Sequence, residues 1–275
     1  MSRWRRCAAA LWLACATAAA APPALPGVSL RGAFEQGAVL FGHTDPRAAV
    51  QFEGRPLRLT PAGDFVFGLD RDAPPQCTLS VRLPGRPEAA RRFAVRKQRW
   101  RIQRIEGLPP ELVTPPPEVT QRILDEAKLM EAAHARDSDW GDFLQPFAWP
   151  AQGRVSGVFG SQRVLNGTPK KPHYGVDIAV PVGTPVRAPA GGVVSLAQPD
   201  LYFTGGTLVI DHGHGLSSVL VHLSRLQVRP GERVARGQLV ALSGMTGRAT
   251  GPHLHWGVYW FDAHVDAQRL VSAPR

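Results

Sequence analysis

Short apolar runs separated by glycine, proline and other turn residues follow one another along most of the chain. Between residues 28 and 95 they include Gly63-Asp-Phe-Val-Phe-Gly68 and the run Cys-Thr-Leu-Ser-Val that starts at Cys77. Such runs are typical of strands joined by tight turns, and they predict a small all-β sandwich over residues 22–98. No chemical motif falls in this part, and we expect His43, which lies in a turn, to be a surface residue.

A second series of strand-like runs starts near residue 149 and continues to the end of the chain. It includes Gly206-Thr-Leu-Val-Ile-Asp and Gln238-Leu-Val-Ala-Leu-Ser, again with glycine- and proline-rich turns between the runs. We expect a second β domain over residues 149–275, which is within the usual size of a domain. The pattern of apolar positions therefore predicts a mainly β chain.

Residues 99–148 differ from both β regions. A dense basic stretch over residues 96–104 leads into two proline clusters, which predict an extended connector. Apolar residues then recur every three or four positions over residues 118–136, and this period predicts a helix that packs on a domain. We expect His134, near the end of this helix, to be a surface or capping residue.

Residues 1–21 have the pattern of a secretory signal, with a basic start, an apolar stretch and small residues before position 22. This pattern predicts export to the periplasm or cell envelope. The apolar stretch is short for a membrane span, although an uncleaved anchor and a lipid anchor at Cys15 stay open as alternatives. Cleavage would leave Cys77 as the lone cysteine, which excludes an intramolecular disulfide and suits a buried apolar position.

The charge of the chain adds a basic character to this picture. The formal net charge is +10, and removal of the three arginines of the signal would leave +7. A basic exported protein is attracted to anionic surfaces such as the cell wall or membrane headgroups. A solvated basic face that aids solubility is the alternative interpretation of this charge. Nucleic acid is not an expected partner, because the sequence has no nucleic-acid-binding motif and no basic stripe with interleaved aromatic residues.

The chemistry is concentrated in histidines of the C-terminal region. One segment pairs a histidine with a carboxylate, one ends an apolar run with a histidine, and one has two histidines two positions apart. One carboxylate and several imidazoles can supply three ligands to a catalytic zinc ion, an open position for water, and spare groups for proton transfer. The residues concerned are His173, Asp177, His222, His253 and His255.

Local geometry constrains these residues further. The prolines that flank His173 and Asp177 favour an extended loop entering a strand rather than a helix. His253 and His255 are expected to project from the same face of a strand, and on this ground either could be a ligand. No glutamate adjoins a ligand-type histidine, so one of the remaining histidines would be the general base.

These segments, in this order, resemble the lysostaphin-type (LytM-type) zinc metallopeptidases, which are murein endopeptidases. Further matching segments include Gly183-Thr-Pro-Val and Val228-Arg-Pro-Gly, so that the resemblance covers residues 150–262. It implies a compact antiparallel β core with a duplicated hybrid motif and one zinc ion (Zn2+) per chain. It also implies roles for the five residues, with His173, Asp177 and His255 as the zinc ligands, and His222 and His253 as the catalytic histidines.

The sequence departs from that family at several positions. Val-Leu-Val precedes His222 where an aromatic residue is usual, and Trp256-Gly257 follows the last ligand where Phe-Glu is usual. These changes concern substrate preference and rate rather than metal binding. Three more histidines are outside the implied site. We expect a structural role for His214 and no particular role for His264. Whether His212 lines the cleft stays open.

The implied function is that of a zinc-dependent metalloendopeptidase that hydrolyses peptide cross-links of peptidoglycan, with the peptide stems as its partner. A function of a different class is that of a catalytically inactive activator or regulator of other cell-wall hydrolases. The ligand set separates the two, and all five positions are filled here, which favours an enzyme. A third class, a wall-binding module, could describe the N-terminal sandwich, which could instead cover the active-site groove.

Overall fold

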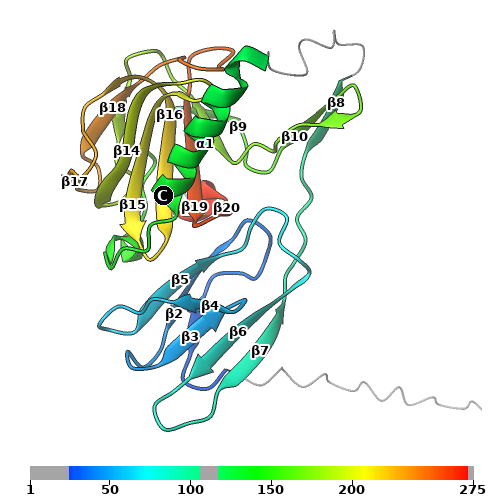
Figure 1. Ribbon diagram of the computed structural model, residues 1–275, viewed down its shortest axis with the longest axis vertical. Coiled ribbons are helices and arrows are strands. Elements are labelled where there is room, and N and C mark those ends of the chain that lie inside the picture. Colours follow the sequence, from blue (N-terminus) through cyan, green and yellow to red (C-terminus); the bar gives the residue numbers. More distant parts are fainter. Residues whose placement is uncertain (1–24, 106–116, 272–275) are drawn as a thin grey trace, which may run out of the picture.

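The computed structural model describes residues 25–105 and 117–271 (Figure 1). Strands dominate both parts, and the described residues contain a single α-helix, which confirms the predicted mainly β fold. The predicted signal, the alternative anchor at Cys15 and most of the proline clusters lie outside the described residues. None of the described helices is long and apolar enough to cross a membrane. The predicted boundaries of separate domains, at residues 22–98, 99–148 and 149–275, stay a prediction.

The N-terminal region is built from two antiparallel sheets, one in the order β1-β2-β5 and the other in the order β4-β3-β6-β7. The alternation of apolar and polar positions lets each strand direct one set of side chains inward. The two sheets form the expected sandwich, seen in the lower half of Figure 1. The strands are β1 (Ser29–Arg31), β2 (Val39–His43), β3 (Ala49–Phe52), β4 (Arg55–Leu57), β5 (Asp64–Gly68), β6 (Gln76–Arg82) and β7 (Ala89–Ala94).

Phenylalanine rings join the two sheets of the sandwich. The rings of Phe52 in β3 and Phe67 in β5 stack with their centroids 4.5 Å apart, and Phe65 and Phe67 are fully buried. Burial of one such side chain contributes about 1.5–3 kcal/mol to stability. An aromatic core therefore holds this region together.

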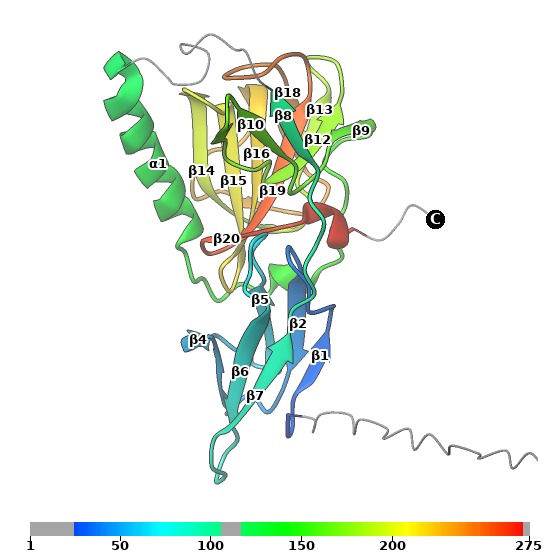
Figure 2. The ribbon, with the colours of Figure 1, turned by 90° about the vertical axis from the view of Figure 1, so that its right-hand side faces the viewer.

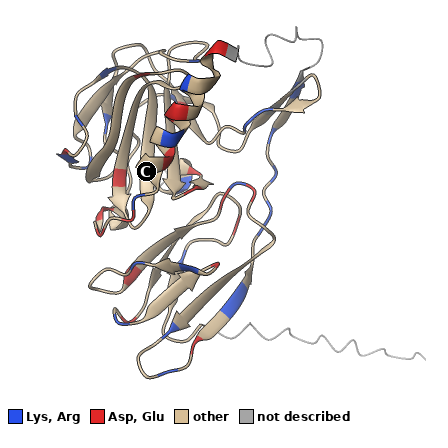
Figure 3. Cartoon of the chain, viewed as in Figure 1, with Lys and Arg blue, Asp and Glu red and all other residues tan. Residues whose placement is uncertain are grey.

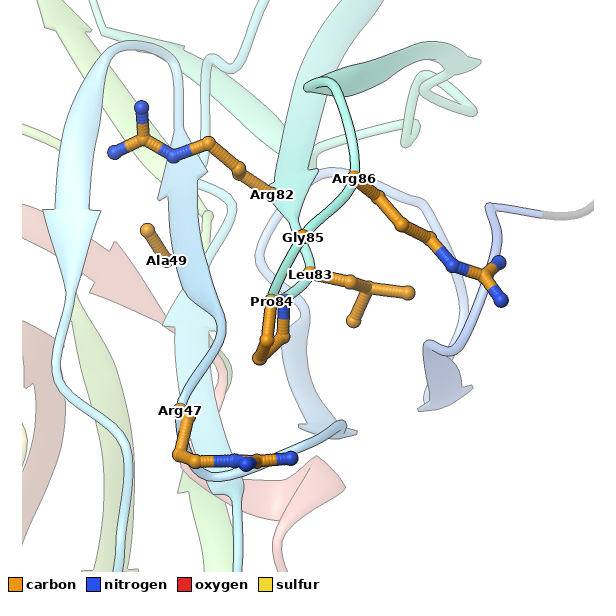
Figure 4. Close-up of a pocket in the computed structure, with 7 residues that line it drawn as sticks. All are labelled: Arg47, Ala49, Arg82, Leu83, Pro84, Gly85 and Arg86. Atoms are coloured by element: carbon orange, nitrogen blue, oxygen red, sulfur yellow. The ribbon is translucent and has the colours of Figure 1, made fainter.

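A cavity of about 390 Å³ lies beside the turn between β6 and β7 (Figure 4). Three arginines, Arg47, Arg82 and Arg86, are among the residues that line it, and their guanidinium groups point to different sides in Figure 4. Arg47 is already paired with Asp45 at 2.9 Å. The turn lies at the end of the sandwich away from the C-terminal sheet (Figure 1), so the cavity is remote from the predicted zinc site.

The residues between the two regions form a strand and a helix. β8 (Ile102–Ile105) follows the basic stretch and pairs in parallel with β10 (Gln162–Leu165), so this part of the connector is built into a sheet. The 3₁₀ helix η2 (Pro117–Val119) leads into α1 (Thr120–His134), which confirms the helix predicted over residues 118–136.

The expected surface position of His134 is wrong, because α1 lies along an outer face of the C-terminal sheet (Figures 1 and 2). The side chain is buried, its ring stacks on that of Tyr259 with centroids 4.0 Å apart, and its Nδ1 lies 3.0 Å from Oγ of Ser217. Apolar side chains of the helix and the sheet fill the rest of this contact. The helix therefore covers the sheet, and β15 (Gly205–Gly213) is buried along its whole length.

The C-terminal region is an antiparallel sheet in the order β17-β14-β15-β16-β19-β12-β9, with β13, β18 and β20 paired beside this path. β10 and β11 form a separate three-stranded sheet with β8. The further elements are η3 (Asp142–Leu144), β9 (Arg154–Gly157), β11 (Thr168–Pro169), β12 (Gly175–Ala179), β13 (Pro185–Arg187), β14 (Gly192–Leu201), β16 (Leu216–Leu226), β17 (Arg233–Val234), β18 (Leu239–Ser243), β19 (Leu254–Trp260), β20 (Ala263–Val265) and η4 (Ala267–Arg269).

Buried contacts join the two regions. The ring of Phe52 lies edge-on to that of Trp260, with centroids 5.7 Å apart. The side chain of Arg71 is only 6% exposed, and its Nε and Nη2 donate to the carbonyl oxygen of Gly160 at 3.0 and 2.8 Å. Because a buried guanidinium needs such acceptors, this contact fixes the sandwich against the segment that follows β9.

His264 belongs to the same interface and is not incidental to the structure. Its backbone N donates to Oδ2 of Asp70 at 2.9 Å, and its Nδ1 lies 3.2 Å from the same oxygen. Its ring stacks on that of Tyr174 with centroids 3.5 Å apart. Tyr174 directly follows His173 in the chain, so this histidine connects the sandwich with the segment that carries a predicted zinc ligand.

Candidate metal and catalytic site

Three predicted ligands meet at one point of the C-terminal sheet. Nε2 of His173 lies 2.9 Å from Oδ1 of Asp177, and Nδ1 of His255 lies 2.8 Å from the same oxygen. The two nitrogens are 2.9 Å apart. Two imidazole nitrogens and a carboxylate oxygen therefore face one another in a partly buried position that could hold a metal ion.

Two strand pairings bring these residues together from distant parts of the sequence. β12 pairs with β19, and in this register Asp177 stands opposite His255. β19 pairs on its other side with β16, where Val221 stands opposite His255 and His222 follows. His173 lies in the loop that enters β12, as the flanking prolines predict.

Two glycines leave the space that the cluster occupies. A Cβ atom on Gly157 would clash with the carboxylate of Asp177, and one on Gly175 would lie 2.6 Å from Nε2 of His255. Real Cβ atoms essentially never approach another atom within 3.0 Å. Sequence reasoning did not identify either glycine, although Gly175 stands inside the segment from His173 to Asp177.

A backbone hydrogen bond orients the ring of His173. Its Nδ1 donates to the carbonyl oxygen of Val158 at 3.0 Å, which leaves the lone pair on Nε2, the atom that faces the other two ligands. Backbone bonds from His173 N to Ser161 O, at 2.7 Å, and from Gly160 N to His173 O, at 2.8 Å, hold the loop itself. The ring is thus held in a position to bind a metal before any ion arrives.

The two predicted catalytic histidines lie beside the ligands. The ring centroids of His222 and His253 are 4.7 Å apart, and Nε2 of His253 lies 3.8 Å from Oδ1 of Asp177. Nδ1 of His222 donates to the carbonyl oxygen of Thr246, and Nδ1 of His253 donates to that of Gly251, both at 2.8 Å. Each ring therefore keeps the lone pair of Nε2 available to accept a proton.

The backbone of His222 is in the left-handed region, with φ of +63°. Its N donates to the carbonyl oxygen of Thr204 at 2.8 Å, next to a shift of register between β15 and β16. Irregular pairing of this kind redirects a side chain, and a left-handed non-glycine residue is held only where the surroundings impose it. The left-handed backbone therefore sets the direction in which the His222 side chain leaves β16.

Thr246 supports this conformation with both its carbonyl and its hydroxyl group. In addition to accepting from His222, it donates from Oγ1 to the carbonyl oxygen of Leu223 and accepts from the backbone N of Gly206, both at 2.9 Å. It therefore joins β15 and β16 at the point where His222 leaves regular pairing. No sequence motif identifies this residue, because its role depends on contacts between three segments.

Burial and mutual contacts set the protonation of the cluster. Burial lowers the pKa of His222 to about 4 and also lowers the pKa of His255, against the opposing contact with Asp177. Burial alone would raise the pKa of Asp177, but the imidazoles of His173 and His255 outweigh it and bring the pKa below its usual range. Neutral imidazoles and an ionised carboxylate are the forms that bind a metal ion.

The donor set fits zinc. Histidine nitrogen and aspartate oxygen are both zinc ligands, and three protein ligands leave a position for water or substrate. His222 and His253 add two proton acceptors next to this position. The arrangement can thus combine a Lewis acid with general acid–base groups.

Other histidines and the lone cysteine of the described residues lie outside the cluster. His212 is not a cleft residue, because it is fully buried and both its ring nitrogens are hydrogen-bonded inside the sheet. His214 is buried with its ring 4.5 Å from that of Phe143, consistent with the expected structural role. His43 is exposed and Cys77 is buried, as predicted, and burial raises the pKa of Cys77 to about 12.

Comparison with known proteins places this arrangement in a family. Residues 171–267, which include the whole cluster, match peptidase family M23. A solved structure of a Pseudomonas aeruginosa protein assigned to peptidase M23 is similar over 88% of this chain and 96% of that one, with 31% identity and a TM-score of 0.68. This chain belongs to peptidase family M23.

Curated relatives match part of this M23 family member. Peptidoglycan DD-endopeptidase ShyA of Vibrio cholerae is 40% identical over 114 residues, 41% of this chain and 26% of that protein. ShyB of the same organism is 42% identical over 98 residues, 36% of this chain and 23% of that protein. The DD-carboxypeptidase/endopeptidase Mpg of Neisseria meningitidis is 40% identical over 96 residues, 35% of this chain and 21% of that protein. The matches thus span about a quarter of the length of these relatives.

Proposed function

We propose that this M23 family member is a zinc-dependent metalloendopeptidase that hydrolyses peptide cross-links of bacterial peptidoglycan. The observation that carries the proposal is the convergence of ligand atoms from His173, Asp177 and His255 within 2.9 Å of one another, next to two further histidines. The substrate class is supported by the relatives, because two of them are named peptidoglycan DD-endopeptidases.

The three converging residues would hold one zinc ion. When bound, zinc would polarise the scissile carbonyl group and lower the pKa of the attacking water to about 7. The ionised carboxylate of Asp177 would balance part of the charge of the cation. The bond from His173 to the carbonyl oxygen of Val158 keeps its Nε2 lone pair directed at the ligand position.

His222 and His253 would carry the proton transfers. Each donates from Nδ1 to a backbone carbonyl group, so each presents an Nε2 that can accept the proton of the attacking water. The imidazolium that results can donate to the developing oxyanion or to the leaving amine. The lowered pKa of His222 keeps this ring unprotonated at neutral pH, which makes it available as a base.

This function would place the protein in the periplasm or cell envelope. The proposed signal at residues 1–21 would export the chain, and the substrate lies in the wall. The formal net charge of +10 favours contact with anionic wall or membrane surfaces.

The test is incubation of the purified protein with peptidoglycan, with and without a chelator, followed by identification of the released fragments. His255→Ala should lose zinc and cleavage, whereas His222→Ala should keep zinc and lose cleavage. A wild-type protein that binds no zinc, or that releases no peptide-cleaved fragments, would refute the proposal. A wild-type protein that instead stimulates another wall hydrolase would support the activator alternative.

A further inference from the structure

Positive charge is concentrated on the small sheet that contains β8. Residues 97–105 and 158–171, which we call the basic arm, contain seven lysines and arginines and no aspartate or glutamate. Figure 3 shows blue and no red on β8 and β10. Such a one-sided distribution does not arise from the demands of strand pairing, since exposed strand positions accept either sign of charge.

Four charges of the arm face solvent. Lys97, Arg99, Arg101 and Arg104 are all exposed. None of them takes part in the ion pairs found among residues 25–105 and 117–271. By contrast, Arg96 at the start of the basic stretch is paired with the buried Glu35. The exposed charges therefore have no role in holding the described structure together.

The arm is firmly anchored on its inner side. The ring of Trp100 lies edge-on to that of Phe159, with centroids 5.6 Å apart, and the guanidinium of Arg71 lies 5.4 Å from the centre of the same indole. Trp100 stands between the exposed Arg99 and Arg101, so the anchor holds both of their backbones in place. Pre-ordered groups lose less entropy on binding than mobile ones.

Backbone bonds connect the arm to the loop of the proposed zinc ligand His173. Gln162 N donates to Arg101 O at 2.9 Å, and His173 N donates to Ser161 O at 2.7 Å. Neighbouring strands lie about 4.8 Å apart, so the backbone of Arg101 is about 10 Å from that of His173. A bound extended peptide rises about 3.3 Å per residue and would reach the arm about three residues from the cleaved bond.

We propose that the basic arm binds the free carboxylates of peptidoglycan stem peptides and aligns the stem beside the proposed active site. The inference rests on the proposed function, because its ligand is the substrate of that function. Stem peptides carry several free carboxylates, and guanidinium groups pair with carboxylates through two parallel hydrogen bonds. The direct connection of the arm to the His173 loop favours the substrate as occupant over a membrane surface.

The test combines Arg99→Gln, Arg101→Gln and Arg104→Gln in one variant. These substitutions remove three charges from exposed side chains and keep their approximate length and polarity. Circular dichroism and thermal unfolding confirm that the fold is unchanged. Binding to purified peptidoglycan is measured in the presence of a chelator, so that cleavage plays no part in the result.

A matched control removes the same number of charges at the cavity of the N-terminal sandwich, with Arg47→Gln, Arg82→Gln and Arg86→Gln. We expect the arm variant to raise the Kd for peptidoglycan by about tenfold at low salt and the control by less than about twofold. On peptidoglycan with amidated carboxylates, the wild type and the arm variant should bind equally weakly.

Equal losses in the two variants would overturn the proposal, because they would reflect the total charge of the protein. A loss that persists on amidated peptidoglycan would also overturn it. So would arm-dependent binding to phosphatidylglycerol vesicles with unchanged binding to peptidoglycan, which would assign the arm to a membrane surface.

The result can be separated from that of the proposed function. If the wild type binds peptidoglycan through the arm but cleaves nothing, the endopeptidase proposal fails and the arm proposal stands. If the wild type cleaves but the arm variant has an unchanged Kd and KM, the arm proposal fails and the endopeptidase proposal stands.

Discussion

The N-terminal and C-terminal regions are both antiparallel β structures, yet the strands of the C-terminal region bury more polar side chains. The sandwich is closed by phenylalanine rings such as Phe65 and Phe67. The C-terminal sheet also buries polar residues along its strands, among them Asp211, His212 and Ser218. Apolar contacts are non-directional, whereas buried polar groups need partners at defined distances and angles. Register is therefore specified most strictly where the site is built.

The strongest test of this comparison is at the ligand cluster. His255→Ala would leave His173 and Asp177 without their third partner, so zinc should be lost. Because a bound metal contributes several kcal/mol of transition-state stabilisation, cleavage should fall by about 10³-fold or more. Metal content and fragment release from peptidoglycan measure this, with the exposed His43→Ala in the sandwich as a control. Retention of full zinc by the variant would contradict the ligand assignment.

A substitution in the core of the sandwich should change the stability of the protein but not its zinc content. Phe67→Ala would leave a cavity among stacked rings and should lower the free energy of unfolding by about 3–5 kcal/mol. Zinc content per folded molecule should stay unchanged. Urea unfolding and metal analysis of the same samples check both points. A parallel loss of zinc affinity would show that the aromatic core and the site form one cooperative unit, so that the two regions would not differ in this respect.

The helix contact of the C-terminal region should make stability depend on pH. Burial lowers the pKa of His134 from 6.5 to about 4. Its contribution is complete above pH 6.5 and is lost as the pH falls toward 4, because only the unfolded state takes up a proton in this window. The loss should approach about 3 kcal/mol.

The variant His134→Phe isolates this contribution, since it keeps a ring against Tyr259 and does not titrate. The difference in unfolding free energy between the wild type and this variant should shrink or change sign from pH 7 to pH 4. A difference that is constant over that range would rule out the assignment of the titration to His134.

The interface should transmit a smaller effect from the sandwich to the site. Arg71→Met removes two hydrogen bonds to the carbonyl oxygen of Gly160. The backbone N of Gly160 in turn donates to the carbonyl oxygen of His173. We expect a loss of about 2 kcal/mol in stability and a fall in kcat of about tenfold, as for residues that orient metal ligands. Arg92→Met, at an exposed position of the same region, is the matched control. Equal effects of the two substitutions would show that the bonds from Arg71 to Gly160 do not help to position the His173 loop.

The smallest expected effect concerns Thr246. Thr246→Val removes the hydroxyl that bonds to Leu223 O and Gly206 N but keeps the branched shape and the carbonyl group. Stability should fall by about 1 kcal/mol, and kcat should fall several-fold with KM unchanged, because His222 loses support while the proposed zinc ligands do not. Thr246→Ser should restore most of the activity. A change in KM alone would point to substrate contact instead of positioning.

Much of this molecule follows from local patterns. The alternation of apolar residues predicted strands in both regions, and the period over residues 118–136 predicted α1. The five residues of the site were also found from their types and spacing, because chemical groups are visible in a sequence without any fold. Their division into ligands and proton carriers came from the family resemblance, and it stays a prediction that the metal analysis above would test.

Other features depended on contacts that no local pattern encodes. The parallel pairing of β8 with β10 joins residues of the connector to the site loop, and it turns a basic stretch into an arm beside His173. His134 was predicted at the surface, and His264 was predicted to be incidental. Both predictions failed because the partners of these residues, Tyr259 and Asp70, lie far away in the chain. The roles of Thr246, Gly157 and Gly175 also depend on which segments meet.

The sequence by itself determined the fold class, the helix and the chemical groups of the candidate site, because strand and helix periods and ligand chemistry are local properties. Only the tertiary structure decided the register that places Asp177 opposite His255, the strained backbone of His222 and the buried Arg71 between the two regions. Register and burial arise from long-range packing, and the same residue types in a different register would face the opposite side of the sheet.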